Sequence, residues 1–274
     1  MNSLDSALTH AILDYLGVSR MPPTAASLDA LVAAYTRRVP WESASRIVQH
    51  SQTPALAERP RWPEQFWQTA IEKGTGGTCF ESNYAFFSLL QTLGYSGYLT
   101  INDMRDMNAC HTAIVINLNH QKTLVDVGLP LHAPLLLNPD KTTKRETAFH
   151  TYTITPDAAN HYVIERDRHP RTDCFMLVDT PVPEDAYCAA TTQDYDTNGL
   201  FLDRVIIVRV VEGQVWRFQD EGAPYVLETF VEGYKRYAFL GDEMDAAADK
   251  LARKFDMDRE TIYTALQLTQ PEPE

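Results

Sequence analysis

The chain has 274 residues, of which 44% are hydrophobic and 22% charged, as in an ordinary soluble globular protein. It carries 24 Lys and Arg against 37 Asp and Glu, and the resulting net charge of −13 disfavours binding to nucleic acid or to an anionic membrane. No apolar run approaches the ~18 residues of a transmembrane helix, and the start Met1-Asn2-Ser3 lacks the basic and apolar regions of a signal peptide.

Four cysteines, Cys79, Cys110, Cys174 and Cys188, are spread through the chain. So few thiols at such spacing do not form a disulfide framework, and none belongs to a Cys-x-x-Cys pair of the kind found in structural zinc sites. We therefore expect reduced thiols, no metal and a cytoplasmic protein.

Apolar residues recur at helical spacing through much of the first 95 residues. One helix is expected to end at Gly17, a second to begin after an N-cap at Ser27, and a third to run from Pro63 at its N1 position to Gly74. Their apolar faces are predicted to consist of Leu4, Leu8, Ile12 and Leu16; of Leu28, Leu31, Val32 and Tyr35; and of Phe66, Trp67, Ala70 and Ile71.

A glycine-rich stretch, residues 74–78, leads to Cys79, where another helix is expected to begin and to end at Gly94. A cysteine in the first turn of a helix lies at the positive end of the helix dipole, which favours the nucleophilic thiolate. The glycines allow a substrate or backbone N–H groups to come close to the sulfur. The alternative is a buried structural cysteine beneath a flexible loop. The predicted apolar stripe of this helix consists of Phe80, Tyr84, Phe87 and Leu90.

The apolar spacing changes to that of strands after residue 95. A short strand is expected at 98–101, followed by strands at 111–118 and 121–128 around a turn at Asn119-His120. In such a hairpin Asp126 lies opposite Ala113 and diagonal to His111 on the same face. A diagonal Cβ separation of about 7 Å lets an imidazole and a carboxylate meet. A three-residue turn would instead place the two side chains on opposite faces.

The rest of the chain alternates between strand and helix patterns. Residues 131–150 are expected to be irregular, strands are predicted at 151–155, 161–165 and 175–178, and a hairpin over 205–218 turns at Glu212-Gly213. The pattern over 229–237 is ambiguous, whereas 242–255 and 259–268 are predicted helices. The tail, residues 270–274, is expected to be disordered.

Cys79, His111 and Asp126 have the residue types of a nucleophile, a base and a group that orients the base. A free thiol is only a few per cent ionised at neutral pH; an imidazole can accept its proton, and a carboxylate can fix the ring. Such a set suits acyl transfer through a thioester. Chain order alone does not establish the geometry, and a core histidine or a metal ligand are the alternatives for His111.

Four segments match the motifs of a known family in the same order. Residues 76–83 read Gly-Gly-Thr-Cys-Phe-Glu-Ser-Asn, and residues 39–42 read Val-Pro-Trp-Glu. These resemble the Arg-Gly-Gly-Tyr-Cys-Phe-Glu-x-Asn signature and the Ile-Pro-Phe-Glu segment of the arylamine N-acetyltransferases. His111 at the start of a strand, and Leu-Val-Asp-Val-Gly at 124–128, are similar to that family's histidine strand and aspartate motif. The motif resemblance covers about residues 25–135.

The resemblance implies an α+β fold with a cysteine-proteinase-like core. An N-terminal helical bundle (1–95) would carry Cys79, a central antiparallel β-barrel (96–185) would carry His111 and Asp126, and a C-terminal α/β lid would comprise 186–274. The catalytic residues would meet between the first two parts.

The resemblance also implies a ping-pong reaction. Cys79 would accept an acyl group from acyl-CoA, usually acetyl-CoA, and pass it to an arylamine, hydrazine or arylhydroxylamine. His111 would act as base and then as acid, with Asp126 holding it. Trp41, Phe80 and Gly128 are candidate substrate-binding residues; for Trp41 the alternative is an ordinary core position. No metal, nucleic acid or membrane takes part.

The chain departs from the family pattern at several positions near the predicted site. Thr75 and Thr78 replace the Arg and the Tyr of the cysteine motif, and Ser43-Ala44 replaces Asn-Leu. Leu129-Pro130 follows the aspartate motif, where the family usually continues Phe-Gly. These changes retain the triad but leave the donor open. A related branch, the macrolactam-forming amide synthases, uses a carrier-bound acyl chain and an aromatic amine, and such a carrier-linked acyltransferase is the main alternative.

Two other classes share the same order of residues. A cysteine hydrolase of transglutaminase or papain type would hand the thioester to water and release free acid without an amine. A non-catalytic binding protein would keep the fold and have a Cys79 no more reactive than Cys174 or Cys188.

Overall fold

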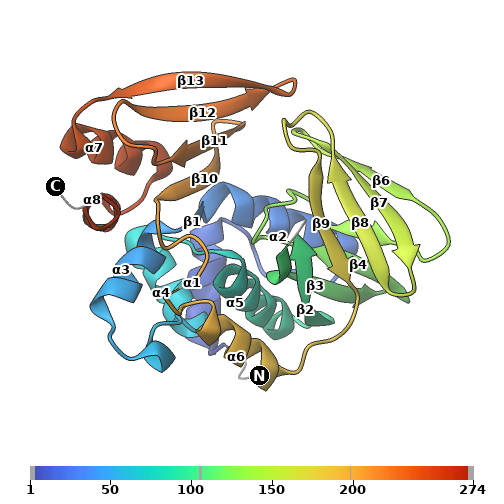
Figure 1. Ribbon diagram of the computed structural model, residues 1–274. Coiled ribbons are helices and arrows are strands. Elements are labelled where there is room, and N and C mark those ends of the chain that lie inside the picture. The colour runs from blue at the N-terminus through green and yellow to red at the C-terminus, as the bar shows by residue number, and fades with distance from the viewer. Residues whose placement is uncertain (1–3, 105–106, 198, 271–274) are drawn as a thin grey trace.

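The protein is represented by a computed structural model that describes residues 4–104, 107–197 and 199–270. The expectations for the first three residues and for residues 271–274 of the tail lie outside this description. The elements form a helical part, an eight-stranded sheet and a smaller sheet with two helices (Figure 1). No helix in the described part of the chain is both long and apolar enough to cross a membrane.

The first part is helical, as the apolar spacing predicts. Gly17 ends the first helix and Gly74 the fourth, each in the left-handed conformation that glycine adopts without strain. The second helix begins at Ala25, with Thr24 rather than Ser27 as its N-cap; Ser27 instead completes a capping box. The helices are α1 (Ser6–Leu16), α2 (Ala25–Arg38), α3 (Ala44–Gln52), the short 3₁₀ turn η1 (Leu56–Glu58), α4 (Pro63–Lys73) and α5 (Cys79–Thr92).

The helix α5 differs from the predicted amphipathic helix, because it is buried on every side. All twelve residues from Cys79 to Leu90 are buried, so the stripe at Phe80, Tyr84, Phe87 and Leu90 is only part of a core that surrounds the helix. α5 packs on α4 on one side and on two strands of the large sheet on the other. Its first residue, Cys79, is thereby held where the helices meet the sheet.

The large antiparallel sheet has the order β5-β4-β3-β2-β9-β8-β7-β6. Contacts of β5 with β6 and β7 bring its two ends together, so the sheet curls into a nearly closed barrel. The predicted strands are confirmed, but the irregular region at 131–150 contains two short strands. The bounds are β2 (Ser96–Met104), β3 (Met107–Leu118), β4 (Gln121–Val125), β5 (Leu135–Leu137), β6 (Thr143–Glu146), β7 (Thr151–Ala158), β8 (His161–Arg166) and β9 (Asp173–Val178).

The last part of the chain forms an α/β lid. Its hairpin turns at Glu212-Gly213 as predicted, and the ambiguous segment at 229–237 belongs to a second hairpin. The sheet order is β1-β10-β11-β12-β13, so a short strand from the helical part joins the lid. The elements are α6 (Glu184–Gln193), β1 (Trp41–Glu42), β10 (Ile206–Val211), β11 (Gln214–Gln219), β12 (Tyr225–Val231), β13 (Tyr234–Gly241), α7 (Met244–Phe255) and α8 (Arg259–Leu268).

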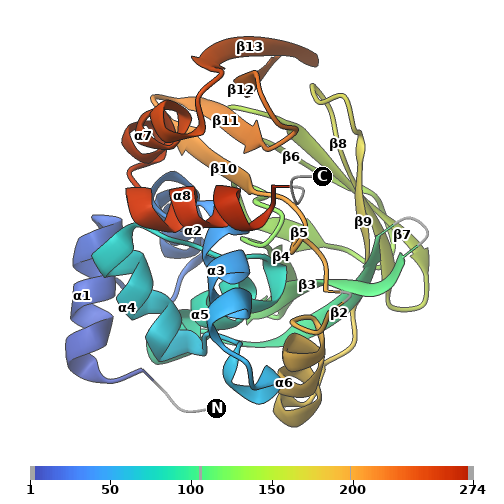
Figure 2. The same cartoon turned by 60° about the vertical axis from the view of Figure 1, so that its left-hand side comes forward.

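Strands β12 and β13 of the lid lie at the end of the molecule opposite α6 in both views (Figure 1, Figure 2). A mixed fold of helical bundle, barrel and lid is therefore confirmed. The division at residues 95 and 185 stays a prediction, since β1 pairs with β10 and α6 begins at Glu184.

The central position of α5 generates a test of stability. Phe86 is fully buried in this helix, whereas Phe239 on β13 is 64% exposed. We expect Phe86→Ala to lower the free energy of unfolding by about 3–5 kcal/mol through lost burial and a residual cavity. The matched change Phe239→Ala should stay within about 0.5 kcal/mol. Urea unfolding followed by circular dichroism measures both, and equal losses would contradict a core centred on α5.

Candidate active site

Cys79 is the first residue of α5, as predicted. Its N-cap, Thr78, is extended, and the first backbone bond of the helix runs from Ser82 N to Thr78 O. The first amides of a helix have no partner inside it, so they are free to face a negative charge. The side chain of Cys79 is 6% exposed, and Sγ lies 3.8 Å from the carbonyl oxygen of Cys110, directly before His111.

The hairpin of β3 and β4 brings His111 and Asp126 together. Its turn is Asn119-His120, both with positive φ, and the pairs Leu118–Gln121 and Ile114–Val125 have the predicted register. Asp126 follows the last paired residue of β4. His111 Nε2 lies 2.6 Å from Asp126 Oδ2, and both side chains are buried. The diagonal contact expected from the sequence is therefore present.

Asp126 is surrounded by hydrogen-bond donors. Its Oδ2 faces His111, and its Oδ1 accepts from Asn83 Nδ2 at 3.0 Å, from Gly128 N at 2.8 Å and from Leu129 N at 2.9 Å. The carboxylate is fully buried, and these donors supply the hydrogen bonds that a buried polar group requires. The two backbone donors come from its own loop, so the sequence after β4 folds around the carboxylate.

The environment of His111 keeps the imidazole protonated. Burial alone would lower the pKa of His111, but the charge of Asp126, the hydrogen bond to it and the neighbouring Cys79 side chain raise this pKa to about 10. A protonated ring carries an N–H on each nitrogen; Nε2 faces Asp126, and Cys79 is among the neighbours that influence the ring. Cys79 therefore lies near a charged imidazole, the neighbour that a cysteine nucleophile requires.

Asn83, the last residue of the cysteine motif, and Thr112 are parts of this site that were not among the predicted site residues. Asn83 Nδ2 also donates to the Thr112 carbonyl at 2.7 Å, and its Oδ1 accepts from Val127 N at 3.0 Å. Thr112 Oγ1 donates to the Cys79 carbonyl at 2.9 Å. The signal for Asn83 is its place one helical turn after Cys79. Thr112 has no comparable signal.

Gly128 lies against Cys79 and leaves no room for a side chain. A Cβ at this position would lie 2.5 Å from Cys79 Cα and 2.6 Å from Cys79 Cβ. Gly128 therefore sets how closely the aspartate loop approaches the start of α5. Its predicted role in substrate binding stays a prediction.

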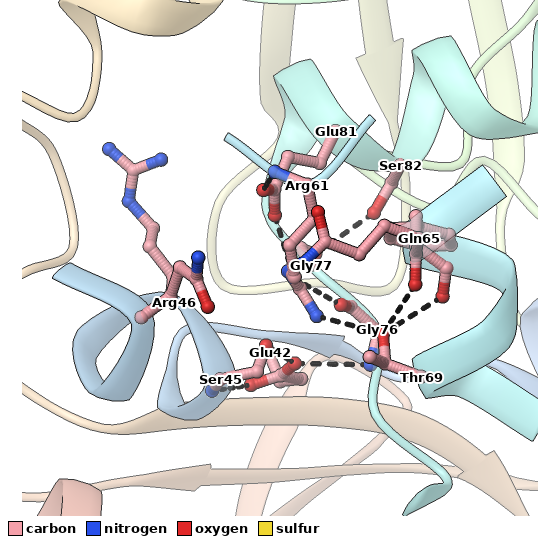
Figure 3. Close-up of polar contacts among 12 residues, drawn as sticks. Glu42, Ser45, Arg46, Arg61, Gln65, Thr69, Gly76, Gly77, Glu81 and Ser82 are labelled. Atoms are coloured by element: carbon pink, nitrogen blue, oxygen red, sulfur yellow. Dashed lines mark hydrogen bonds and ion pairs between the residues drawn. The ribbon is translucent and has the colours of Figure 1, made fainter. Parts of the chain in front are cut away.

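The loop before Cys79 is held from both sides by buried charges (Figure 3). Gly76 N donates to Glu42 Oε1 at 3.0 Å, and Arg61 Nη2 donates to the Gly76 carbonyl at 2.7 Å. The same nitrogen of Arg61 forms a 2.7 Å ion pair with Glu81, two residues into α5 after Cys79. Burial opposes the charge of Arg61, but Glu81, Tyr195 and Glu42 raise its pKa above the ordinary value, so it stays a cation.

The other two predicted substrate-binding residues lie in different surroundings. Trp41 lines a small cavity with Val127 and Pro130, beside the aspartate loop, and its ring packs edge-on against Phe201. Phe80 is 3% exposed and packs against Tyr187 in the core. Cys79 and His111 are not among the residues that line the cavity. The remaining lining residues are Tyr35, Thr36, Val39, His132, Val208, Arg209, Val210 and Val215.

Metal ligation was one alternative for His111. Among residues 4–104, 107–197 and 199–270, no group of three or more His, Cys, Asp or Glu side chains could hold a metal ion.

Comparison with known proteins places this site in a family. A model of a family described as N-acetyltransferase matches residues 24–215, well over half of the chain and all three residues of the site. No curated protein sequence matches the chain closely enough to count as a relative.

Several solved arylamine N-acetyltransferases share the fold. That of Mycobacterium smegmatis has a TM-score of 0.80 at 16% identity, over 98% of this chain and 100% of that one. That of Salmonella typhimurium has 0.78 at 14% identity, over 96% and 98%. That of Mycobacterium marinum, in a complex with CoA, has 0.77 at 18% identity, over 94% and 97%. At such identities the likeness establishes the fold, and the family model adds the relationship in sequence: the chain belongs to the arylamine N-acetyltransferase family.

Proposed function

We propose that this family member transfers an acetyl group from acetyl-CoA to an arylamine, hydrazine or arylhydroxylamine through an acyl-cysteine at Cys79. The observation that carries the proposal is the 2.6 Å contact between His111 and a fully buried Asp126, with Cys79 beside the same imidazole. A carboxylate beside an imidazole that in turn lies beside a thiol is the arrangement of a catalytic triad.

The first half-reaction would form the acyl-enzyme. The Cys79 thiolate attacks the thioester carbonyl, and the backbone amides of the first turn of α5 face the negative charge that develops on its oxygen. The C–S bond to CoA then breaks, and the imidazolium of His111 supplies the proton that the departing CoA thiolate takes up.

The second half-reaction would transfer the acetyl group to the amine. The amine nitrogen attacks the acyl-cysteine carbonyl, neutral His111 accepts the proton that the nitrogen loses, and Cys79 leaves as a thiolate. Asp126 stabilises the imidazolium that results, and its hydrogen bond to Nε2 keeps the other ring nitrogen directed at the sulfur. The triad thereby returns to its starting charge state.

Apolar side chains line a small cavity beside the aspartate loop, about 10 Å³ in volume, which is the space of a single water molecule. The lining includes Trp41 from the Pro-Trp-Glu segment and Val208 and Val210 from β10. An arylamine is weakly basic, so its acylation needs a reactive thioester and little competing water, and the burial of Cys79 limits access of water.

A carrier-linked donor is the second candidate. Pro130 stands where the family usually has glycine, and it lines the same cavity as Trp41. Neither Cys79 nor His111 lines this cavity, so the ground for a donor on a carrier protein is the departure from the family motif itself. The triad chemistry is the same in both cases.

The intermediate itself is the first test. Acetyl-CoA without an amine should add about 42 Da to the intact protein, because the acetyl group replaces the proton of one thiol. Cys79→Ala should abolish this gain in mass. Cys188 is also a free thiol, and the control variant Cys188→Ala should retain the gain.

The result separates the alternatives. No adduct on a rapidly alkylated Cys79 would contradict the CoA donor and favour the carrier-linked reaction. Continuous release of acetate without an amine would identify a hydrolase. A Cys79 that neither accepts acetyl nor reacts faster than Cys174 would contradict the enzyme as a whole.

The role of His111 generates a second test. His111→Gln should lower the rate of acetyl transfer to aniline or phenylhydrazine by about 10²–10⁴-fold, because proton transfer is lost in both half-reactions. His10→Gln, on the exposed face of α1, is the matched control and should leave the rate unchanged. Single-turnover kinetics with pre-acetylated protein isolate the second step. A His111→Gln variant with the wild-type rate would contradict the proposed base.

A further inference from the structure

The loop before Cys79 contacts a positively charged side chain that comes from outside the cysteine motif. The family signature has an arginine at the position of Thr75. Thr75 is buried, and its Oγ1 has no hydrogen-bond partner among the described residues. A guanidinium nevertheless lies against this loop, and it comes from Arg61, in the segment that precedes α4.

Arg61 and Glu42 fix both polar groups of Gly76. The amide of Gly76 donates to Glu42, and its carbonyl accepts from Arg61. Ser45 N donates to the other oxygen of Glu42 at 2.8 Å, so this carboxylate is itself held. The Gly76 backbone is thus held between two buried charges of opposite sign, three residues before the nucleophile (Figure 3).

The loop packs tightly against the Pro40 carbonyl and against the ion pair of Arg61 and Glu81. A Cβ at Gly76 would lie 1.7 Å from the Pro40 carbonyl oxygen, and one at Gly77 would lie 3.0 Å from Glu81 Oε2 and 3.2 Å from Arg61 Nη2. The loop therefore lies directly on the ion pair, and a shift of that pair moves the loop.

Glu81 connects the same guanidinium to α5. Its Oε2 pairs with Arg61 Nη2, and its Oε1 accepts from Arg61 N at 2.8 Å and from Tyr195 Oη at 2.6 Å. Since Glu81 is the third residue of α5 and Cys79 the first, Arg61 holds the chain on both sides of the nucleophile.

We propose that Arg61 is a positioning residue for the acyl-transfer reaction, supplying from outside the cysteine motif the guanidinium that fixes the Gly76 carbonyl and Glu81 around Cys79. This inference rests on the proposed function, which supplies the acyl-transfer reaction that Arg61 would assist. The geometry of the loop and the reactivity of the thiol are measurable without an acyl donor.

Arg46 provides a matched control. It is also fully buried and pairs with an acidic residue, Asp194, at 2.9 Å. Its other contacts are the Asp194 and Leu200 carbonyls and the ring of Tyr195. In Figure 3 Arg46 lies apart from the contacts that join Arg61, Gly76 and Glu81. Removing either arginine deprives a carboxylate of its ion-pair partner, the buried Glu81 or the partly buried Asp194, but of the two arginines only Arg61 contacts the loop before Cys79.

The test compares Arg61→Met, Arg61→Lys and Arg46→Met in the full chain, at a temperature at which each is folded by circular dichroism. Hydrogen exchange of a peptide that covers residues 74–79 reports the loop, and the rate of Cys79 alkylation by iodoacetamide at pH 7 reports the nucleophile. Both methionine variants should lower the melting temperature. Only Arg61→Met should raise exchange in the loop and slow alkylation, each by at least tenfold.

Arg61→Lys keeps the charge but can reach fewer acceptors, so we expect values between those of the wild type and Arg61→Met. If Arg61→Met does not fold, Arg61→Lys carries the comparison with Arg46→Met. Equal effects of the changes at Arg61 and Arg46 on loop exchange and alkylation would overturn the proposal. If the wild type takes no acetyl from acetyl-CoA while these differences hold, the proposed donor fails and the role of Arg61 stands.

Discussion

The site depends on one buried carboxylate. Asp126 has no exposed surface, and its two oxygens contact four nitrogen donors, one of them on His111. A buried negative charge is costly unless it is paired and hydrogen-bonded, so the loop, α5 and β3 must all be in place before the charge is tolerated. The same charge then holds a proton on the imidazole beside Cys79. Stability and chemistry are thereby linked through a single group.

Contacts from the helical part and from the barrel fix Cys79, the proposed nucleophile. Asn83 and Thr112 join the first turn of α5 to the barrel, whereas Arg61 and Glu42 join the loop before it to the helical part. Tyr195, which lies between α6 and the lid, completes the shell of Glu81. A thiol at the start of an ordinary surface helix would lack this support, and the support explains why α5 is buried all round.

The sequence predicts those contacts of the site that local backbone geometry determines, but not those that depend on distant parts of the chain. The turn at Asn119-His120 determines which face each residue of the hairpin occupies, so the contact of Asp126 with His111 follows from counting. The surroundings of α5 do not follow from its pattern, because a helix buried on every side has no polar face to set a period. Arg61 gives no local signal either, since its partner Glu81 is distant in sequence and meets it only in the folded chain. Thr24 and Ser27 are both good caps; in the structure Thr24 is the N-cap, and the Ser27 hydroxyl bonds to the nearby Pro22 carbonyl and to Tyr95.

Asp126 is expected to keep His111 charged beside a reactive Cys79. The most direct test is the pH dependence of Cys79 alkylation, measured in the wild type and in Asp126→Asn. Asparagine retains an oxygen for the donors of Asn83, Gly128 and Leu129 but removes the charge that raises the pKa of His111. The account predicts rapid wild-type alkylation across neutral pH, a loss of at least tenfold at pH 7 in Asp126→Asn, and rates that converge near pH 10, where a thiol ionises without assistance. Identical rates and pH profiles in the two proteins would contradict it.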